Sequence, residues 1–226
     1  MATALQLVNK VLVELREPTV ADFSAEYTTF VLQKLNQAKR EVEDAYAWDA
    51  LRTVITFPTV SGTETYNLGT SGVAVGGTTT ERSYLVKDQW GREMVYDTTS
   101  KTQLTLAGAE YHRSLSQLAQ MQNASPGPFS LLRASTGYSM RLYPKPNGVY
   151  TITSTWIIPQ ADFTTTATVL SVPEAPVWLR AAAYCAGERG DGLGERAAAL
   201  MASADTALSN AMQYGRDLNE LVCYPE

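Results

Sequence analysis

The sequence predicts an α+β fold in which two helix pairs, one from each end of the chain, form a four-helix bundle that carries an inserted antiparallel β domain. Three observations lead to this prediction: apolar residues recur at helical spacing near both termini, the middle of the chain alternates polar with β-branched residues, and Gly- and Pro-rich turns separate the two patterns. We place the helical bundle in residues 1–50 and 171–226 and the β domain in residues 51–170.

Two amphipathic helices are expected before residue 50. Pro18 ends the first, and Asp22 is the expected N-cap of a long second helix that reaches about Trp48. The apolar stripes are Leu5, Val8, Leu12 and Leu15, then Tyr27, Val31, Leu35, Ala38, Val42 and Ala45. The charged residues of the second helix are expected on its solvent face: Lys34, Lys39, Arg40, Glu41, Glu43 and Asp44.

The pattern changes to strands near residue 50. LRTVITFP and TETYNL read as strands, residues 69–81 as a Gly- and Thr-rich loop, and RSYLVKDQWGREMVYD as a hairpin that turns around Gln89 to Gly91. A short helix is expected in AEYHRSLSQLAQ, and FSLLRAS is a further strand. The stretch YSMRLYPKPNGVYTITSTWIIP is expected to be two alternating strands joined by a turn at Pro144, Pro146 and Asn147-Gly148.

The helical pattern returns after residue 170. Residues 174–190 are Ala-rich, and a second stripe then continues to Gly215, where we expect the helix to end. The glycines between the two helices do not have phosphate-loop spacing, and a helix precedes them where a strand would be required. They therefore predict a helix–helix turn.

Composition and motifs argue against several functional classes. Hydrophobic residues make up 45% of 226 residues, which is enough for a real core, but no apolar run reaches the ~18 residues that a membrane span requires. The N-terminus has no signal-peptide pattern. With only Cys185 and Cys223 and no CxxC spacing, a reducing compartment is expected.

We expect no enzymatic activity, no metal and no cofactor. The single His112 argues against zinc or triad chemistry that needs several imidazoles, and no GxSxG, SxxK or HExxH motif occurs. The aromatic residues of the β region have two interpretations: the core of a small β domain, or an exposed face for protein contact. These residues are Tyr84, Trp90, Tyr96, Tyr138, Tyr143, Tyr150 and Trp156.

Charge is distributed unevenly along the chain. Residues 1–50 hold 5 basic and 8 acidic side chains, residues 51–170 hold 9 and 7, and residues 171–226 hold 4 and 8. The helical parts are therefore acidic, and no basic patch of the kind that grips phosphates is visible.

Four motifs in this order resemble the head–tail adaptor proteins of tailed bacteriophages, in particular the tail tubular protein A type and related neck adaptors. They are LVELREPTV at the end of the first helix, QAKREVEDAYAWDALR leading into a strand, MRLYPKPNGVYTITSTW, and VPEAPVWLRAAAYCAGERGD opening the third helix. The YPxP strand is the most specific of them. The resemblance covers roughly residues 5–50 and 82–215; residues 69–81 and the tail after 215 depart from it.

The resemblance implies a homo-oligomeric ring of about twelve subunits below the portal of the virion, assembled in the host cytoplasm. Its partners would be the portal protein, the next tail protein (a nozzle or stopper) and, in some cases, tail fibres. Double-stranded DNA would pass through the lumen without tight binding, which the acidic helical parts would favour by repelling phosphates. No membrane partner is implied.

The apolar tail is our candidate for an interface with the portal or a neighbouring subunit. It is expected to order only on contact. Its residues are Leu218, Leu221, Val222, Tyr224 and Pro225.

Three alternatives remain open on the sequence. The protein could be a stopper or tail-completion ring, a receptor-binding module of a fibre or baseplate, or a hydrolase. A receptor-binding module predicts exposed Trp and Tyr around a pocket, and a hydrolase predicts a converging carboxylate pair in a deep cleft.

Overall fold

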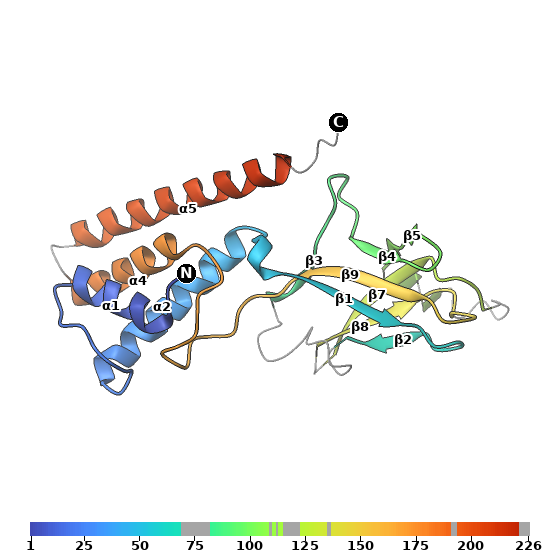
Figure 1. Ribbon diagram of the computed structural model, residues 1–226, viewed down its shortest axis with the longest axis horizontal. Coiled ribbons are helices and arrows are strands. Elements are labelled where there is room, and N and C mark those ends of the chain that lie inside the picture. The colour runs from blue at the N-terminus through green and yellow to red at the C-terminus, as the bar shows by residue number, and fades with distance from the viewer. Residues whose placement is uncertain are drawn as a thin grey trace. The chain divides into compact units, whose positions relative to one another are not determined.

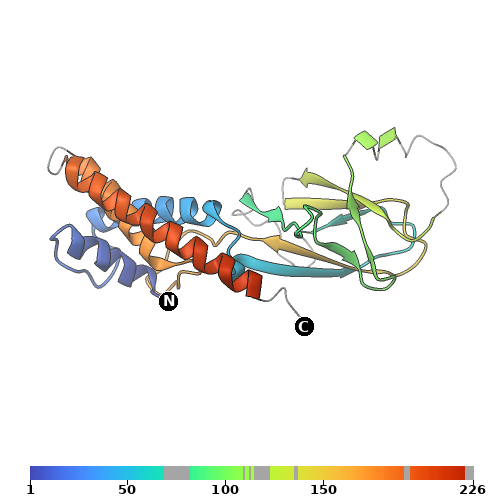
Figure 2. The ribbon, with the colours of Figure 1, turned by 90° about the horizontal axis from the view of Figure 1, so that it is seen from above.

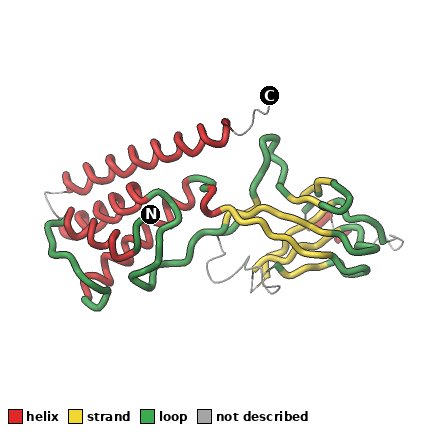
Figure 3. Tube along the Cα trace, viewed as in Figure 1, coloured by secondary structure: helices red, strands yellow, loops and turns green. Residues whose placement is uncertain are grey.

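The computed structural model describes residues 1–68, 82–108, 110, 111, 113, 114, 123–134, 137–190 and 194–221. It confirms the mixed α+β class. The chain forms two compact units, a helical unit of residues 1–50 and 160–226 and a β unit of residues 51–159 (Figure 1). Figure 3 shows the same division by colour, with the long helices in one unit and the strands in the other.

In the helical unit, α4 (Glu174–Arg189) packs against each of the three other helices. These are α1 (Ala4–Glu14), α2 (Glu26–Ala45) and α5 (Glu195–Leu221). Figure 2 shows α5 running alongside α4. The buried core contains most residues of the stripes predicted for α1 and α2, although Leu5 and Tyr27 are only partly buried and Ala45 is exposed. It also includes Leu7, Val177 and Ala181, which the predicted stripes left out, and Leu200 and Ala204 of α5.

The helix ends differ from the prediction in two places. Asp22 is not the N-cap of α2; Ala25 is, without a side-chain hydrogen bond. The Asp22 carboxylate instead accepts hydrogen bonds from the hydroxyl and the backbone N–H of Ser24, which lower its pKa. Asp22 is therefore used in a local turn of the preceding loop.

Gly215 does not end the last helix, because α5 continues to Leu221. A Cβ at Gly215 would lie 3.2 Å from Cε1 of Tyr46. The missing side chain thus serves close packing against the Tyr46 ring, and glycine is tolerated within a helix at a cost of about 1 kcal/mol.

The expected solvent face of α2 is only partly exposed. The Lys39 and Glu43 side chains are fully buried, with Lys39 Nζ 3.4 Å from Glu43 Oε1. Lys39 also donates hydrogen bonds to the carbonyls of Gln160 (2.6 Å) and Ala161 (2.9 Å), and Glu43 accepts one from the Gln160 N–H (3.2 Å). The prediction of exposure was wrong for these two residues because a segment more than 115 residues away covers them.

The β unit contains two sheets. The first has the order β1-β9-β4-β5, with β3 also paired to β9, and the second has the order β2-β8-β7-β6, in which only β6 and β7 are parallel. The strands of the first sheet are β1 (Arg52–Pro58), β3 (Tyr84–Leu85), β4 (Val95–Asp97), β5 (Thr102–Gln103) and β9 (Thr151–Ile157). Those of the second are β2 (Thr65–Asn67), β6 (Thr105–Leu106), β7 (Pro128–Ala134) and β8 (Gly137–Leu142).

One apolar core joins the two sheets. Ile55, Val95 and Trp156 from the first sheet and Phe129 and Met140 from the second belong to the same buried cluster. Each of these side chains is at most 1% exposed. The sheets therefore pack face to face, as alternating strands with one apolar face require.

The expected hairpin of residues 138–158 is wrong in its pairing. Both strands exist, but β8 pairs with β7 and β2, whereas β9 pairs with β1, β3 and β4. The segment that contains Pro144 and Pro146 thus connects two different sheets. Alternation predicts a strand but not its partner, because the partner is chosen by tertiary packing.

The expected turn at Gln89–Gly91 is present, with Lys87 bridged to Glu93 across it and a φ of 75° at Gly91. Residues 69–81 and most of the helix expected in AEYHRSLSQLAQ lie outside the described residues.

Candidate functional site

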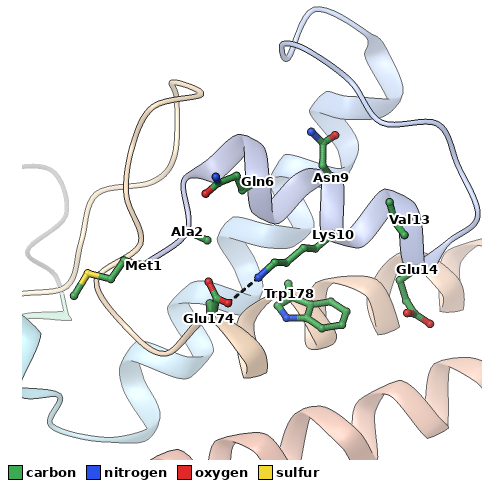
Figure 4. A pocket seen from close by; sticks show the side chains of 9 residues that line it. All are labelled: Met1, Ala2, Gln6, Asn9, Lys10, Val13, Glu14, Glu174 and Trp178. Carbon is green, nitrogen blue, oxygen red and sulfur yellow. Dashed lines mark hydrogen bonds and ion pairs between the residues drawn. The ribbon is translucent and has the colours of Figure 1, made fainter.

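A groove lies between α1 and α4 in the helical unit (Figure 4). Its volume is about 720 Å³. One side of the groove is lined by residues of α1, including Gln6, Lys10, Val13 and Glu14. The other side is lined by Glu174 and Trp178 of α4.

The local sequence explains why these side chains meet. α1 begins with a capping box in which the Thr3 hydroxyl accepts a hydrogen bond from the Gln6 N–H and the Gln6 side chain accepts one from the Thr3 N–H. From this start, one face of α1 points into the core. Val13 lies on the opposite face and is 61% exposed. The groove thus combines an exposed aliphatic side chain with the half-buried Trp178.

The groove also carries charge. Lys10 Nζ lies 2.7 Å from Glu174 Oε1, and both side chains are 41% exposed. Glu14 is 3.5 Å from Arg196. Each of the two carboxylates at this hollow is therefore paired with a cation, Glu174 with Lys10 and Glu14 with Arg196.

A second hollow, of about 560 Å³, lies between α2 and α4. It is lined by Lys34, Gln37, Ala183, Tyr184, Gly187 and Glu188. Lys34 Nζ and Glu188 Oε1 form an ion pair across it at 2.8 Å, and Lys34 lowers the pKa of Glu188.

A polar network beside this hollow links three helices. Arg180 of α4 pairs with Glu41 of α2 at 3.4 Å and with Asp205 of α5. The Tyr184 hydroxyl donates a 2.5 Å hydrogen bond to Glu41. Burial and that hydrogen bond raise the pKa of Tyr184 to about 12, so the phenol remains a neutral donor. These groups hold helices together and show no arrangement of nucleophile and base.

The described part of the chain contains no group of three His, Cys, Asp or Glu side chains that could hold a metal ion. Cys185 is buried, and burial raises its pKa to about 11, so it is a packing residue. His112 and Cys223 lie outside the described residues. Among the described helices, none combines the length and the apolar character that crossing a membrane requires.

The sequence-predicted interface residues are only partly described. The backbone of Leu218 and Leu221 belongs to the last turns of α5, but their side chains, and all of Val222, Tyr224 and Pro225, lie outside the described residues. Their role stays a prediction.

The aromatic residues of the β unit divide between core and surface. Trp156 is fully buried, its indole N–H donates to the Ser154 hydroxyl at 2.9 Å, and its ring lies 5.3 Å from the ring of Tyr138. Trp90 is 69% exposed and Tyr84 42%. The interpretation as a β core is confirmed for Trp156, whereas Trp90 lies on the surface.

Gly190 ends α4 where the sequence predicts a helix–helix turn; residues 191–193 of that turn lie outside the described residues. Gly190 adopts φ 68° and caps α4, with its N–H bonded to the carbonyls of Ala186 and Gly187. The left-handed conformation explains why glycine stands there.

Sequence reasoning missed the α1–α4 groove and left open whether Trp90 belongs to the core or to an exposed face. Both depend on which helix or strand covers which face. The sequence held no usable signal for the groove, because a single aliphatic residue on a polar helix face, such as Val13, is normal on a protein surface.

A protein-family model described as SU10 adaptor protein matches residues 2–221. A comparison with curated proteins gave no match.

Proposed function

Since the chain belongs to the SU10 adaptor protein family, we propose that it is a structural head–tail adaptor of a tailed bacteriophage. In this proposal, copies of the protein form a ring below the portal, continue the DNA channel and provide the attachment platform for the tail. The observation that carries the proposal is the family match over residues 2–221, which extends from α1 to the end of α5 and includes the whole β unit.

The proposal also covers the domain organisation of the chain and the number of copies in the ring. We propose that the four helices act as a four-helix bundle, in a domain of residues 1–50 and 171–226, and that residues 51–170 are an inserted β domain. The packing of α4 against α1, α2 and α5 supports the bundle. The resemblance to the tail tubular protein A type supports a ring of about twelve copies.

The charge of the helical unit supports a role beside DNA. This unit holds 9 basic and 17 acidic side chains, a net charge of −8, whereas the β unit holds 9 and 6, a net charge of +3. We propose that the helical unit lines the channel, where its negative charge lets DNA slide without sticking. A ring structure with a basic lumen would contradict this.

Mass photometry of the protein alone and mixed with portal rings of its phage tests the main proposal. We expect about a dozen copies to join each portal ring. A protein that ignores the portal would contradict the adaptor role. Tests with other tail components would then separate a stopper or tail-completion ring from a receptor-binding module.

A truncation before Asn219 tests the proposed role of the tail. We expect loss of portal binding or of contact between subunits with an unchanged fold. A truncated protein that joins the portal as the full chain does would contradict the role of Leu221, Val222, Tyr224 and Pro225.

A further inference from the structure

Trp90 lies in the turn between β3 and β4 (Figure 1), and its indole side chain is 69% exposed to solvent. The Asp88 carboxylate accepts hydrogen bonds from the backbone N–H groups of Trp90 and Arg92, both at 2.9 Å. It also pairs with the Arg92 guanidinium at 2.9 Å, which lies 4.7 Å from the centre of the Trp90 ring. We call Trp90 and Arg92 the tip.

The tip has the properties of a binding anchor. Trp90 is 69% exposed and contributes nothing to the core of the β unit. Trp and Arg are the residues most enriched among energetic centres of protein interfaces. Because Asp88 already orders the turn, docking the tip would cost little conformational entropy.

The α1–α4 groove offers matching chemistry. Val13 and Trp178 provide apolar surface for an indole. The Glu174 carboxylate, which pairs with Lys10 at 2.7 Å and is 41% exposed, has a further lone pair for a guanidinium. A volume of about 720 Å³ accommodates both side chains. At longer range, the unit that carries the tip has a charge of +3 and the unit that carries the groove has −8, so these two units attract each other.

We propose that the tip of one copy docks in the α1–α4 groove of a second copy. The indole packs on Trp178 and Val13, and the Arg92 guanidinium pairs with Glu174. Tip and groove are different surfaces, so the contact is heterologous, and contacts of this kind generate rings when the rotation closes. The inference rests on the proposed function, because it names the contact that would build the adaptor ring.

Two variants separate the two halves of the contact. Trp90→Ala removes the tip, and Val13→Arg places a cation in the groove; both positions are exposed, so neither change should disturb folding. Tyr214→Ala is the matched control, because Tyr214 is an aromatic residue of equal exposure (70%) outside both surfaces. Thermal unfolding verifies that all three fold.

Sedimentation velocity over a concentration series measures association of the free protein, and mass photometry measures copy number on portal rings. We expect Trp90→Ala and Val13→Arg each to weaken association at least about thirtyfold, and Tyr214→Ala to leave it unchanged. An equal mixture of the two variants should form dimers and nothing larger, because the intact tip of one fits the intact groove of the other.

Reversing both charges of the proposed Arg92–Glu174 ion pair tests whether the exchanged pair restores association. Arg92→Glu and Glu174→Arg should each weaken association about tenfold, and the double variant should recover most of the loss. Variants that associate as the wild type does, or a wild type that associates neither alone nor on the portal, would overturn the inference.

The experiment also separates this inference from the proposed function. If portal rings recruit the protein but tip and groove variants join in the same copy number, the adaptor role stands and the docking contact fails. If copies associate through tip and groove but ignore the portal, the contact stands and the adaptor role fails.

Discussion

Charged side chains serve different purposes in the two units. In the helical unit, Lys39 and Arg180 join segments far apart in the sequence. In the β unit, the Asp88 and Asp97 carboxylates bind backbone N–H groups no more than four residues ahead. Arg141 and Lys145 are exceptions, since both pair with Glu64, which directly precedes β2.

The difference follows from how the two kinds of element satisfy their backbones. A helix completes its hydrogen bonds internally, so specific connections between helices must come from side chains. Strands connect to one another through their backbones, so their polar side chains are left for turns. Stability in the β unit should therefore depend on its apolar core, and in the helical unit also on its buried charges.

The largest expected effect is in the β core. Trp156→Ala should lower the free energy of unfolding by about 3–5 kcal/mol, because it empties the centre of the two-sheet core and leaves the Ser154 hydroxyl without its donor. Urea unfolding followed by circular dichroism measures this. Trp90→Ala, at the exposed tip, is the control and should change the value by less than about 0.5 kcal/mol. Equal losses would contradict the assignment of the core.

A slightly smaller effect is expected from the buried charge of the helical unit. Lys39→Met should cost about 3 kcal/mol, because Glu43 and two carbonyls lose their donor while remaining buried. Lys10→Met, which breaks a half-exposed ion pair, should cost under about 1 kcal/mol. If Lys39→Met and Lys10→Met lower the free energy of unfolding by the same amount in urea, the buried ion pair contributes no more to the stability of the helical unit than the exposed one.

Two glycines test helix packing at the level of about 1 kcal/mol. Gly187→Ala should stabilise α4 by about 0.5–1 kcal/mol, because the new methyl group meets Ala197 at an ordinary 3.8 Å. Gly215→Ala should gain less, or destabilise, because Tyr46 stands 3.2 Å away. Thermal unfolding measures the change in stability of both variants. An equal gain would show that the Tyr46 side chain moves away from the new methyl group at no cost.

The last prediction is a pH dependence that is confined to alkaline solution. The pKa of Tyr184 is raised from 10.0 to about 12, so the folded state keeps this proton where the unfolded state has lost it. Its contribution is complete below pH 10 and is lost as pH rises towards 12. Between these values the free energy of unfolding should fall more steeply in the wild type than in Tyr184→Phe. Parallel curves would contradict the role of the Tyr184–Glu41 hydrogen bond.

Much of the fold could be predicted because its elements are encoded locally. Periodicity located α1, α2 and the strands at 52–58 and 151–157, and glycine located the turn after α4. Apart from the N-cap of α2, the errors share one cause, which is contact with a segment distant in the sequence. Lys39 was predicted to be exposed because the carbonyls that bind it belong to Gln160 and Ala161, and no pattern in the sequence near Lys39 indicates this contact.

The candidate site was less predictable than the fold. The groove requires α1 and α4 to meet, and these helices are separated by about 160 residues. Trp178 was visible in the sequence as part of an Ala-rich helix, but neither its partners nor the hollow beside it could be derived from spacing. The exposed tip was equally hidden, because the aromatic pattern fits a core residue and a surface residue alike.

The sequence by itself determined the class of fold, the order of helices and strands, and the excess of acidic residues in the helical unit, because periodicity, turn residues and charge are local properties of a chain. Only the tertiary structure decided that β8 and β9 belong to different sheets, that Lys39 and Glu43 are buried, and that Val13 and Trp178 share a groove. Each of these depends on which distant segment covers a given face, and that choice is made by the free energy of the whole packed unit.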